Sequence, residues 1–160
     1  MEKELLSILK NNCRLSVEEI AIMLGSTADE VKAMMKELSE KGVIVAYNAL
    51  IDWEKVDHEY VTAYIEVKVT PQRGQGFDKV AERIYKYPQV TACSLVSGGF
   101  DLFVVVEGKN MKEVALFVAE KLAPIESVMS CATHFVLKKY KDSGVIFNKT
   151  YGDDREAVVL

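Results

Sequence analysis

The sequence predicts an α+β protein in which a helical N-terminal part precedes a C-terminal part built on an antiparallel sheet. Three observations support this prediction. Apolar residues recur with helical spacing up to residue 42, the period changes to two at Val43, and residues 60–141 alternate strand and helix patterns. With 160 residues, 49% of them hydrophobic, the chain has enough apolar material for a packed core.

The N-terminal part predicts three short helices. The first covers about residues 2–11. The second starts at Ser16, and Glu19 three residues later completes a capping box, in which each side chain bonds to the backbone N–H of the other residue. Thr27 and Glu30 repeat this capping pattern for the third helix.

The spacing of the second and third helices is typical of a helix-turn-helix. Ala21 is small enough for the helices to cross closely, Gly25 opens the turn, and Val31 buries against the first helix of the pair. The residues flanking Tyr47-Asn48 then predict a short β-hairpin, or wing, so that residues 1–52 form a winged helix-turn-helix. A plain helical bundle or a module that binds a partner is the alternative interpretation.

In a helix-turn-helix the second helix enters the major groove of DNA through its N-terminal half. With the apolar stripe turned inward, the outward side of this helix carries charged and small side chains that reach phosphates or base edges. The predicted DNA-contacting residues are Arg14, Thr27, Lys32, Ala33 and Lys36. An ordinary solvated face is the alternative for the two lysines. Because Asp29 and Glu30 repel phosphate, we expect weak affinity per subunit, strengthened by oligomerisation.

Residues 60–141 predict a split, ferredoxin-like βαββαβ domain with an antiparallel sheet. The strand patterns cover about residues 61–69, 90–97, 102–106 and 128–137. Helical stripes start near Phe77 and Asn110, which gives the order β-α-β-β-α-β. The polar, acidic residues 53–59 are interpreted as a linker, and residues 142–160 as a C-terminal tail without an assigned role.

The strand at residues 102–106 is apolar at every position, although both helices of a split βαβ unit cover the same face of the sheet. Its other face therefore needs a cover as well. We expect a second copy of the chain to provide it in a symmetric homodimer. Packing of the N-terminal helices on this face is the alternative.

Composition excludes several classes of protein. No stretch approaches the ~18 apolar residues that a membrane span needs, and the N-terminus does not have the pattern of a signal peptide. Cys13, Cys93 and Cys131 are odd in number and widely spaced, which favours reduced thiols in the cytoplasm. The net charge of −4 lacks the basic excess of a strong nucleic-acid footprint.

The residues that carry catalysis are scarce. The chain has two histidines, His58 and His134, and neither belongs to a nucleophile-and-base arrangement or to a pattern of metal ligands. No phosphate-binding loop or dinucleotide fingerprint is present. The sequence therefore predicts a protein that is not an enzyme and that binds no cofactor or metal.

Three segments together resemble the Lrp/AsnC family of feast/famine transcription regulators: Leu38–Ile44, Tyr47–Asp52 and the turn Gly98–Asp101. The resemblance covers about residues 2–141. It implies a winged helix-turn-helix that binds double-stranded DNA, joined to a domain that senses a small molecule. It also implies dimers that pair through their sheets and assemble to octamers. The effector, usually an amino acid, then lies between dimers.

Carried over residue by residue, the effector-binding positions are Gly98, Gly99, Phe100, Asp101 and Thr133. The exposed backbone at the two glycines can approach a carboxylate or an amine of the ligand, and the Asp101 carboxylate can pair with an ammonium group. The alternative is a tight turn in which Asp101 bonds to the backbone. The chain departs from the family at Ala33 and Met34, where arginine is common.

Two further functions stay open at this point. One is a ligand-sensing oligomer that has lost DNA binding. The other is a tetrapyrrole-modifying enzyme on the same scaffold, as in some relatives of the family. Sequence alone identifies neither the effector nor the operator.

Overall fold

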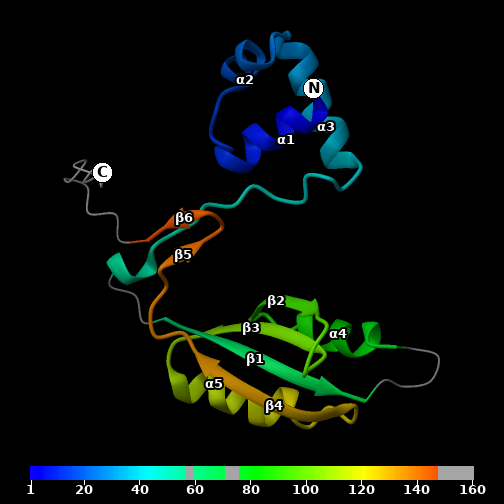
Figure 1. Ribbon diagram of the computed structural model, residues 1–160, viewed down its shortest axis with the longest axis vertical. Coiled ribbons are helices and arrows are strands. Elements are labelled where there is room, and N and C mark those ends of the chain that lie inside the picture. Colours follow the sequence, from blue (N-terminus) through cyan, green and yellow to red (C-terminus); the bar gives the residue numbers. More distant parts are fainter. Residues whose placement is uncertain (57–59, 71–75, 148–160) are drawn as a thin grey trace, which may run out of the picture. The chain divides into compact units, whose positions relative to one another are not determined.

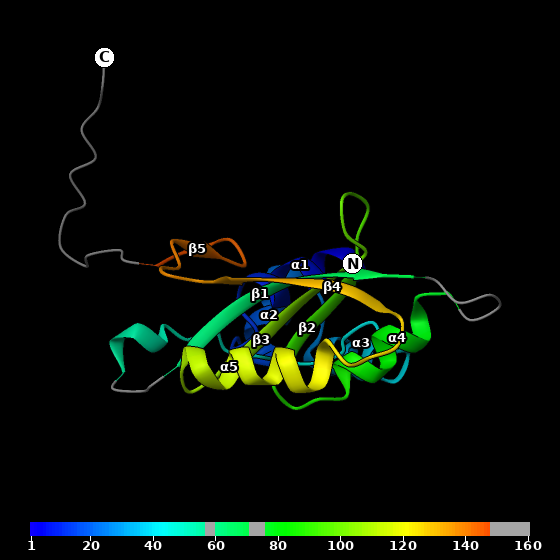
Figure 2. The same ribbon diagram turned by 90° about the horizontal axis from the view of Figure 1, so that it is seen from below.

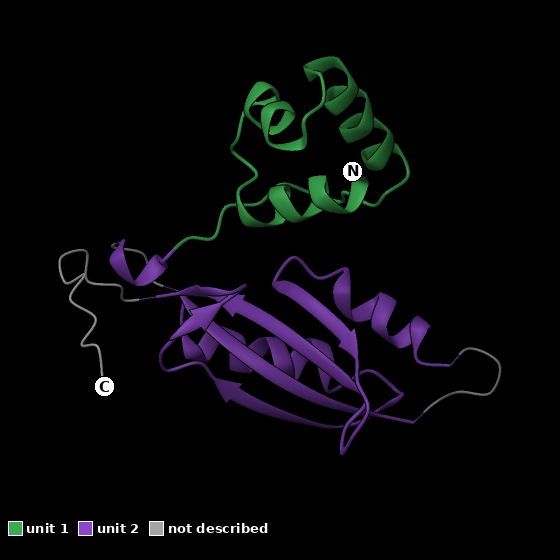
Figure 3. Cartoon of the chain, turned by 45° about the horizontal axis from the view of Figure 1, so that its top comes forward, with its two compact units in different colours: residues 1–51 green, residues 52–160 purple. Residues whose placement is uncertain are grey.

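A computed structural model describes residues 1–56, 60–70 and 76–147 of the chain (Figure 1). The chain divides into two compact units, residues 1–51 and residues 52–160 (Figure 3). Each unit has its own hydrophobic core.

The first unit contains the three predicted helices, α1 (Glu2–Asn11), α2 (Val17–Leu24) and α3 (Ala28–Glu40). Both predicted capping boxes are present, at Ser16 with Glu19 and at Thr27 with Glu30. The apolar stripes of the three helices meet in one core, whose buried members are Leu5, Leu9, Ile20, Ala21, Val31 and Leu38. The predicted helix pairing is therefore confirmed, because Ala21 and Val31 are both buried where α2 and α3 pack together.

Gly25 makes the turn between α2 and α3. Its φ of 62° lies in the left-handed region, where residues with a Cβ atom are strained. The N–H of Ser26 then donates to the carbonyl of Ala21, which closes the end of α2.

The prediction of a hairpin around Tyr47-Asn48 is wrong for the single chain. Residues 43–51 contain no strand, and most of their side chains are exposed. A two-stranded hairpin is marginal in water unless an apolar face packs against something. Only Ile44 among these residues packs against the helical core, so a hairpin here would lack that support.

The second unit has the predicted βαββαβ order (Figure 1). Its elements are β1 (Val61–Val69), α4 (Asp78–Tyr85), β2 (Val90–Leu95), β3 (Leu102–Gly108), α5 (Met111–Phe117) and β4 (Val128–Phe135). The strands form one antiparallel sheet in the order β2-β3-β1-β4. A π-helical turn, Val118–Leu122, extends α5.

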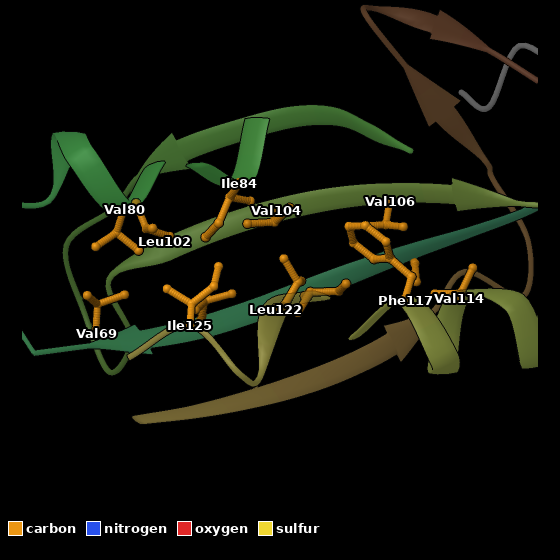
Figure 4. Packing of buried hydrophobic residues seen from close by; sticks show 13 residues of the cluster. Val69, Val80, Ile84, Leu102, Val104, Val106, Val114, Phe117, Leu122 and Ile125 are labelled. Atoms are coloured by element: carbon orange, nitrogen blue, oxygen red, sulfur yellow. The ribbon is translucent and has the colours of Figure 1, made fainter. Parts of the chain in front are cut away.

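Both helices of this unit cover the same face of the sheet (Figure 2). Ile65 of β1 and Val104 of β3 are paired in register, and both are fully buried. Figure 4 shows side chains of β3 meeting Ile84 of α4 and Leu122 after α5 in a single layer. Each fully buried side chain of this size contributes about 1.5–3 kcal/mol of transfer free energy.

Outside this domain the structure describes parts of the predicted linker and tail. Trp53–Lys55 forms a short 3-10 turn, whereas residues 57–59 of the predicted linker lie outside the described residues. The predicted tail starts within a two-stranded hairpin of β5 (Lys141–Asp142) and β6 (Val145–Ile146). Residues 148–160 also lie outside the described part. No helix in the described ranges is long and apolar enough to cross a membrane.

Candidate nucleic-acid interface and ligand site

The N-terminus of α3 is fixed by a hydrogen-bonded network around Glu30. The Glu30 carboxylate accepts from the Ser26 hydroxyl at 2.6 Å and from the Thr27 backbone N–H at 3.1 Å. In return, the Thr27 hydroxyl accepts from the Glu30 N–H at 3.3 Å. The bond from Ser26, followed by those from Thr27, lowers the pKa of Glu30 below its ordinary value. Thr27 therefore positions the start of the helix.

Beyond this cap, α3 exposes one continuous polar side. Lys32, Ala33 and Lys36 are all exposed, while Val31 and Leu38 on the opposite side are buried in the helical core. Lys36 Nζ lies 3.8 Å from a carboxylate oxygen of Glu40, an exposed pair that is worth little in water. Among the described residues, no carboxylate lies within ion-pair distance of Lys32. The ammonium group of Lys32 is thus available to a phosphate.

Arg14 lies in the turn between α1 and α2, and its side chain is exposed. The turn is held by the backbone N–H of Arg14, which donates to Asn12 Oδ1 at 3.0 Å. The next helix turns Glu18 and Glu19 to solvent, and hydrogen bonds from Ser16 lower the pKa of Glu19. The turn and the start of α2 therefore expose both a basic and two acidic side chains.

The turn between β2 and β3 is closed by Asp101. Its backbone N–H donates to the Val67 carbonyl at 3.1 Å, and its carboxylate oxygen Oδ2 accepts from the Val69 N–H at 2.7 Å. Within the described residues, the second oxygen, Oδ1, makes no hydrogen bond. Gly98 has a φ of 142°, and a Cβ atom at Gly98 or Gly99 would meet only open space. The turn thus exposes backbone beside a half-buried carboxylate.

Aromatic rings lie beside this turn, on the sheet face that α4 and α5 do not cover. The ring centroid of Phe103 is 6.4 Å from that of Phe100 and 5.4 Å from that of Tyr64. Val105 pairs with Tyr64 in register and faces the same way. We call Tyr64, Phe103 and Val105 the open-face cluster.

The structure does not bring Thr133 to this turn within one chain. Thr133 of β4 pairs with Ile65, whereas Asp101 bonds at Val67 and Val69, two and four residues further along β1. That offset amounts to roughly 7–13 Å along the strand. Thr133 also shares the helix-covered side of the sheet with Ile65, opposite to the open-face cluster. One chain therefore does not assemble the five predicted effector residues into a single pocket.

Two polar contacts of the sheet unit were not predicted from the sequence. His134 Nε2 lies 3.4 Å from Glu66 Oε1 on the open face. Tyr60 is half-buried, and burial together with a hydrogen bond to Glu107 raises its pKa to about 12. The first contact joins neighbouring strands and the second joins the residue before β1 to β3, so only the arrangement of the strands reveals them. Period-two spacing along one strand carries no such signal.

The structure has a helix pair that exposes one side of α3, and a sheet unit follows it in the chain. These two features define a helix-turn-helix regulator with a second, sheet-based domain. Comparison with known families agrees with this class. Residues 1–45 match a family model of winged helix-turn-helix DNA-binding domains. Residues 62–146 match the Lrp/AsnC ligand-binding domain. The chain therefore belongs to the Lrp/AsnC family of transcription regulators.

Individual relatives support the same assignment. The uncharacterized HTH-type transcriptional regulator YugG of Bacillus subtilis is 52% identical over 160 residues, which covers 99% of this chain and 95% of YugG. Among solved structures, PH0061 superposes with a TM-score of 0.76 at 22% identity, covering 91% of this chain and 95% of its own. The regulator NMB0573 of Neisseria meningitidis, solved in complex with L-Met, gives a TM-score of 0.69 at 23% identity, with 92% and 95% coverage.

Proposed function

We propose that this regulator binds operator DNA through the exposed side of α3 and that an amino acid modulates this binding. The observation that carries the proposal is the capped N-terminus of α3, which leaves Lys32, Ala33 and Lys36 exposed next to it. Arg14 adds a phosphate contact from the turn before α2. Thr27 acts by positioning the helix start. Two lysines and one arginine per chain make each contact weak, so several subunits act together.

The effector site uses the Gly98–Asp101 turn. Oxygen Oδ1 of Asp101 is suited to accept from an ammonium group, and the exposed backbone at Gly98 and Gly99 suits a carboxylate or an amine. Phe100 offers a ring to the ligand's side chain. The complex of the Neisseria regulator with L-Met supports an amino acid as the class of effector. Because Thr133 lies away from this turn, it enters the site from another chain, which agrees with a ligand bound between dimers.

The protein acts as a homodimer that assembles further to an octamer. Phe103 and Val105 form an apolar surface on the sheet face that α4 and α5 do not cover, and burying them against a second copy removes that surface from water. A ligand bound between dimers changes DNA binding when its affinity differs between assembly states. We place the protein in the cytoplasm, together with its DNA, and assign it no enzymatic activity and no cofactor.

The test is DNA binding by a Lys32→Ala/Lys36→Ala double variant on the DNA upstream of the protein's own gene. Fluorescence anisotropy at several salt concentrations is expected to give weaker binding, and a salt slope smaller in magnitude by about 1.8, since each phosphate contact contributes ~0.9. The matched control, Lys112→Ala/Lys121→Ala, removes two exposed lysines of the sheet unit. It is expected to leave the DNA affinity and the salt slope unchanged. An unchanged affinity and slope in the α3 variant would favour the alternative of an oligomer that has lost DNA binding.

The same titration, repeated with each amino acid in turn, tests the effector. One or a few amino acids are expected to shift the DNA-binding curve of the wild-type protein. If no amino acid shifts it, and the purified protein binds a tetrapyrrole with a visible absorption band, the scaffold serves the alternative enzymatic function.

A further inference from the structure

The densest basic stretch of the chain follows the last strand of the sheet. Three of the four residues 138–141 are lysines, which occurs nowhere else in the sequence. The helical unit, by contrast, has six basic and eight acidic side chains in residues 1–51, so its net charge is −2. Because much of the affinity for DNA comes from neutralising phosphates, the basic stretch is a candidate phosphate contact outside the helical unit.

The stretch leads into the hairpin of β5 and β6, and we call residues 138–147 the basic hairpin. Ser143 and Gly144 join the two strands with φ angles of 49° and 85°, both positive, as a tight two-residue hairpin turn requires. The Phe147 N–H donates to the Tyr140 carbonyl at 2.9 Å and extends the ladder. No side chain of the basic hairpin belongs to the hydrophobic core formed by the described residues of the sheet unit. The hairpin is therefore an ordered ribbon that is not packed into the domain.

The basic hairpin leaves the sheet at the end where the chain arrives from the helical unit. β4 ends at Phe135, and the N–H of Val136 donates to the Thr62 carbonyl at 2.9 Å, next to the first residue of β1. The chain enters β1 from the helical unit at this same end. The basic hairpin is thus attached to the end of the sheet that is joined to the DNA-binding unit.

The three lysines of the hairpin have different surroundings. Lys139 Nζ lies 3.0 Å from Asp142 Oδ2, so this lysine holds the hairpin together. Lys138 Nζ lies over the ring of Tyr140, 5.3 Å from its centroid. Lys138 and Lys141 are both exposed, and no carboxylate of the described residues lies within ion-pair distance of either. Their two ammonium groups are therefore available to phosphates.

We propose that the basic hairpin is a second DNA contact, in which Lys138 and Lys141 bind phosphates of the duplex outside the segment that α3 reads. The proposal rests on the proposed function and adds a binding surface to it. Lysine ammonium groups are point charges that bind phosphate without reading the bases, so the contact adds affinity for any sequence. It offsets the repulsion of phosphate by Asp29 and Glu30 near the start of α3.

The salt dependence of DNA binding by the full-length protein tests this contact. Lys138→Ala/Lys141→Ala is expected to weaken binding and to reduce the magnitude of the salt slope by at least about 1.8, because each lost phosphate contact contributes ~0.9. The reduction is expected to be the same on the DNA upstream of the protein's own gene and on a duplex of equal length with a shuffled sequence. Lys138→Arg/Lys141→Arg keeps both charges and is expected to keep the slope. The matched control, Lys79→Ala/Lys121→Ala, removes two exposed lysines of the helical layer and is expected to change neither the affinity nor the slope.

An unchanged slope in Lys138→Ala/Lys141→Ala overturns the proposal, and so does an equal loss in the control, which would indicate a diffuse effect of charge. Light scattering is the second measurement, because Val145 and Ile146 of the hairpin are exposed apolar residues that could contact a second copy. The variant is expected to keep the oligomeric state of the wild type. Dissociation of its oligomer would assign the hairpin to contacts between copies and overturns the proposal as well.

Failure of the proposed function gives a different result. In that case Lys32→Ala/Lys36→Ala also leaves DNA binding unchanged, or the wild-type protein binds no DNA. A loss of affinity in the α3 variant together with an unchanged Lys138→Ala/Lys141→Ala variant overturns the second contact alone.

Discussion

At the residue scale, Asp101 joins three strands of the sheet. It lies in the turn between β2 and β3, yet its backbone and its carboxylate both bond to β1. From the sequence, the candidate roles of Asp101 are effector binding and a bond within the turn. The structure contains a third arrangement, in which one carboxylate oxygen holds the end of β1 and the other has no partner within the described residues. The same side chain can therefore stabilise the fold and bind a ligand.

Substitution at Asp101 separates these two roles. Asp101→Ala leaves the buried N–H of Val69 without its acceptor and is expected to lower the free energy of unfolding by about 1–3 kcal/mol. Asp101→Asn keeps an acceptor oxygen, although a weaker one, and is expected to cost less than Asp101→Ala. Urea denaturation monitored by circular dichroism measures both values. In the DNA-binding titration, Asp101→Asn is expected to lose the response to the amino acid. A full response in this variant would remove Asp101 from the effector site.

At the scale of elements, the turn between α2 and α3 decides how the recognition helix is presented. Gly25 adopts a left-handed conformation there, and nothing lies within 4 Å of the place where a Cβ atom would be. A larger residue at this position therefore meets backbone strain but no steric clash. The loss in free energy of unfolding on substitution thus reports the backbone strain of the turn alone.

Gly25→Ala is expected to lower the free energy of unfolding of the helical unit by about 1–2 kcal/mol, the cost of the left-handed conformation for an L-residue. It is also expected to weaken DNA binding, because relief of the strain changes the angle between α2 and α3. Gly99→Ala is the matched control: this glycine also faces open space, but its φ lies outside the strained region. Thermal denaturation of both variants gives the comparison. Equal stabilities would show that the turn does not need glycine.

At the scale of the whole molecule, the open-face cluster determines the oligomeric state that we propose. Val105→Lys puts a charge at the centre of this apolar surface, and burying a charge without a partner is costly. The dimer is expected to dissociate at least about tenfold more readily, which corresponds to ~1.4 kcal/mol. Ala119→Lys, on an exposed position of the helical layer, serves as the control. Light scattering over a range of concentrations measures both. A Val105→Lys dimer as stable as the wild type would place the interface elsewhere.

The helices were predictable from the sequence because their signals are local. The Ser16 and Thr27 capping boxes each lie within four residues, and the apolar stripe of α3 repeats within two turns. The order of strands and helices in the sheet unit was predictable for the same reason. At residues 43–51 the local signal failed, because a strand exists only when another strand pairs with it.

The candidate site was predictable only in part. Lys32, Ala33 and Lys36 follow from the helical period, which fixes the exposed side of α3. The distance between Thr133 and the Gly98–Asp101 turn depends on strand order and register, which no local pattern contains. For the same reason, the contact between His134 and Glu66 was not predictable from the sequence.

What the sequence determined by itself is thus the set of elements and the side of each helix that is buried, since both depend on residues a few positions apart. Only the tertiary structure decided which strands are neighbours, that Asp101 bonds to β1, and that Thr133 lies away from the Gly98–Asp101 turn within one chain. These features depend on contacts between residues far apart in the chain. Such contacts form when apolar surfaces pack together. Many sequences share the same local patterns, so these patterns alone do not specify which distant residues meet.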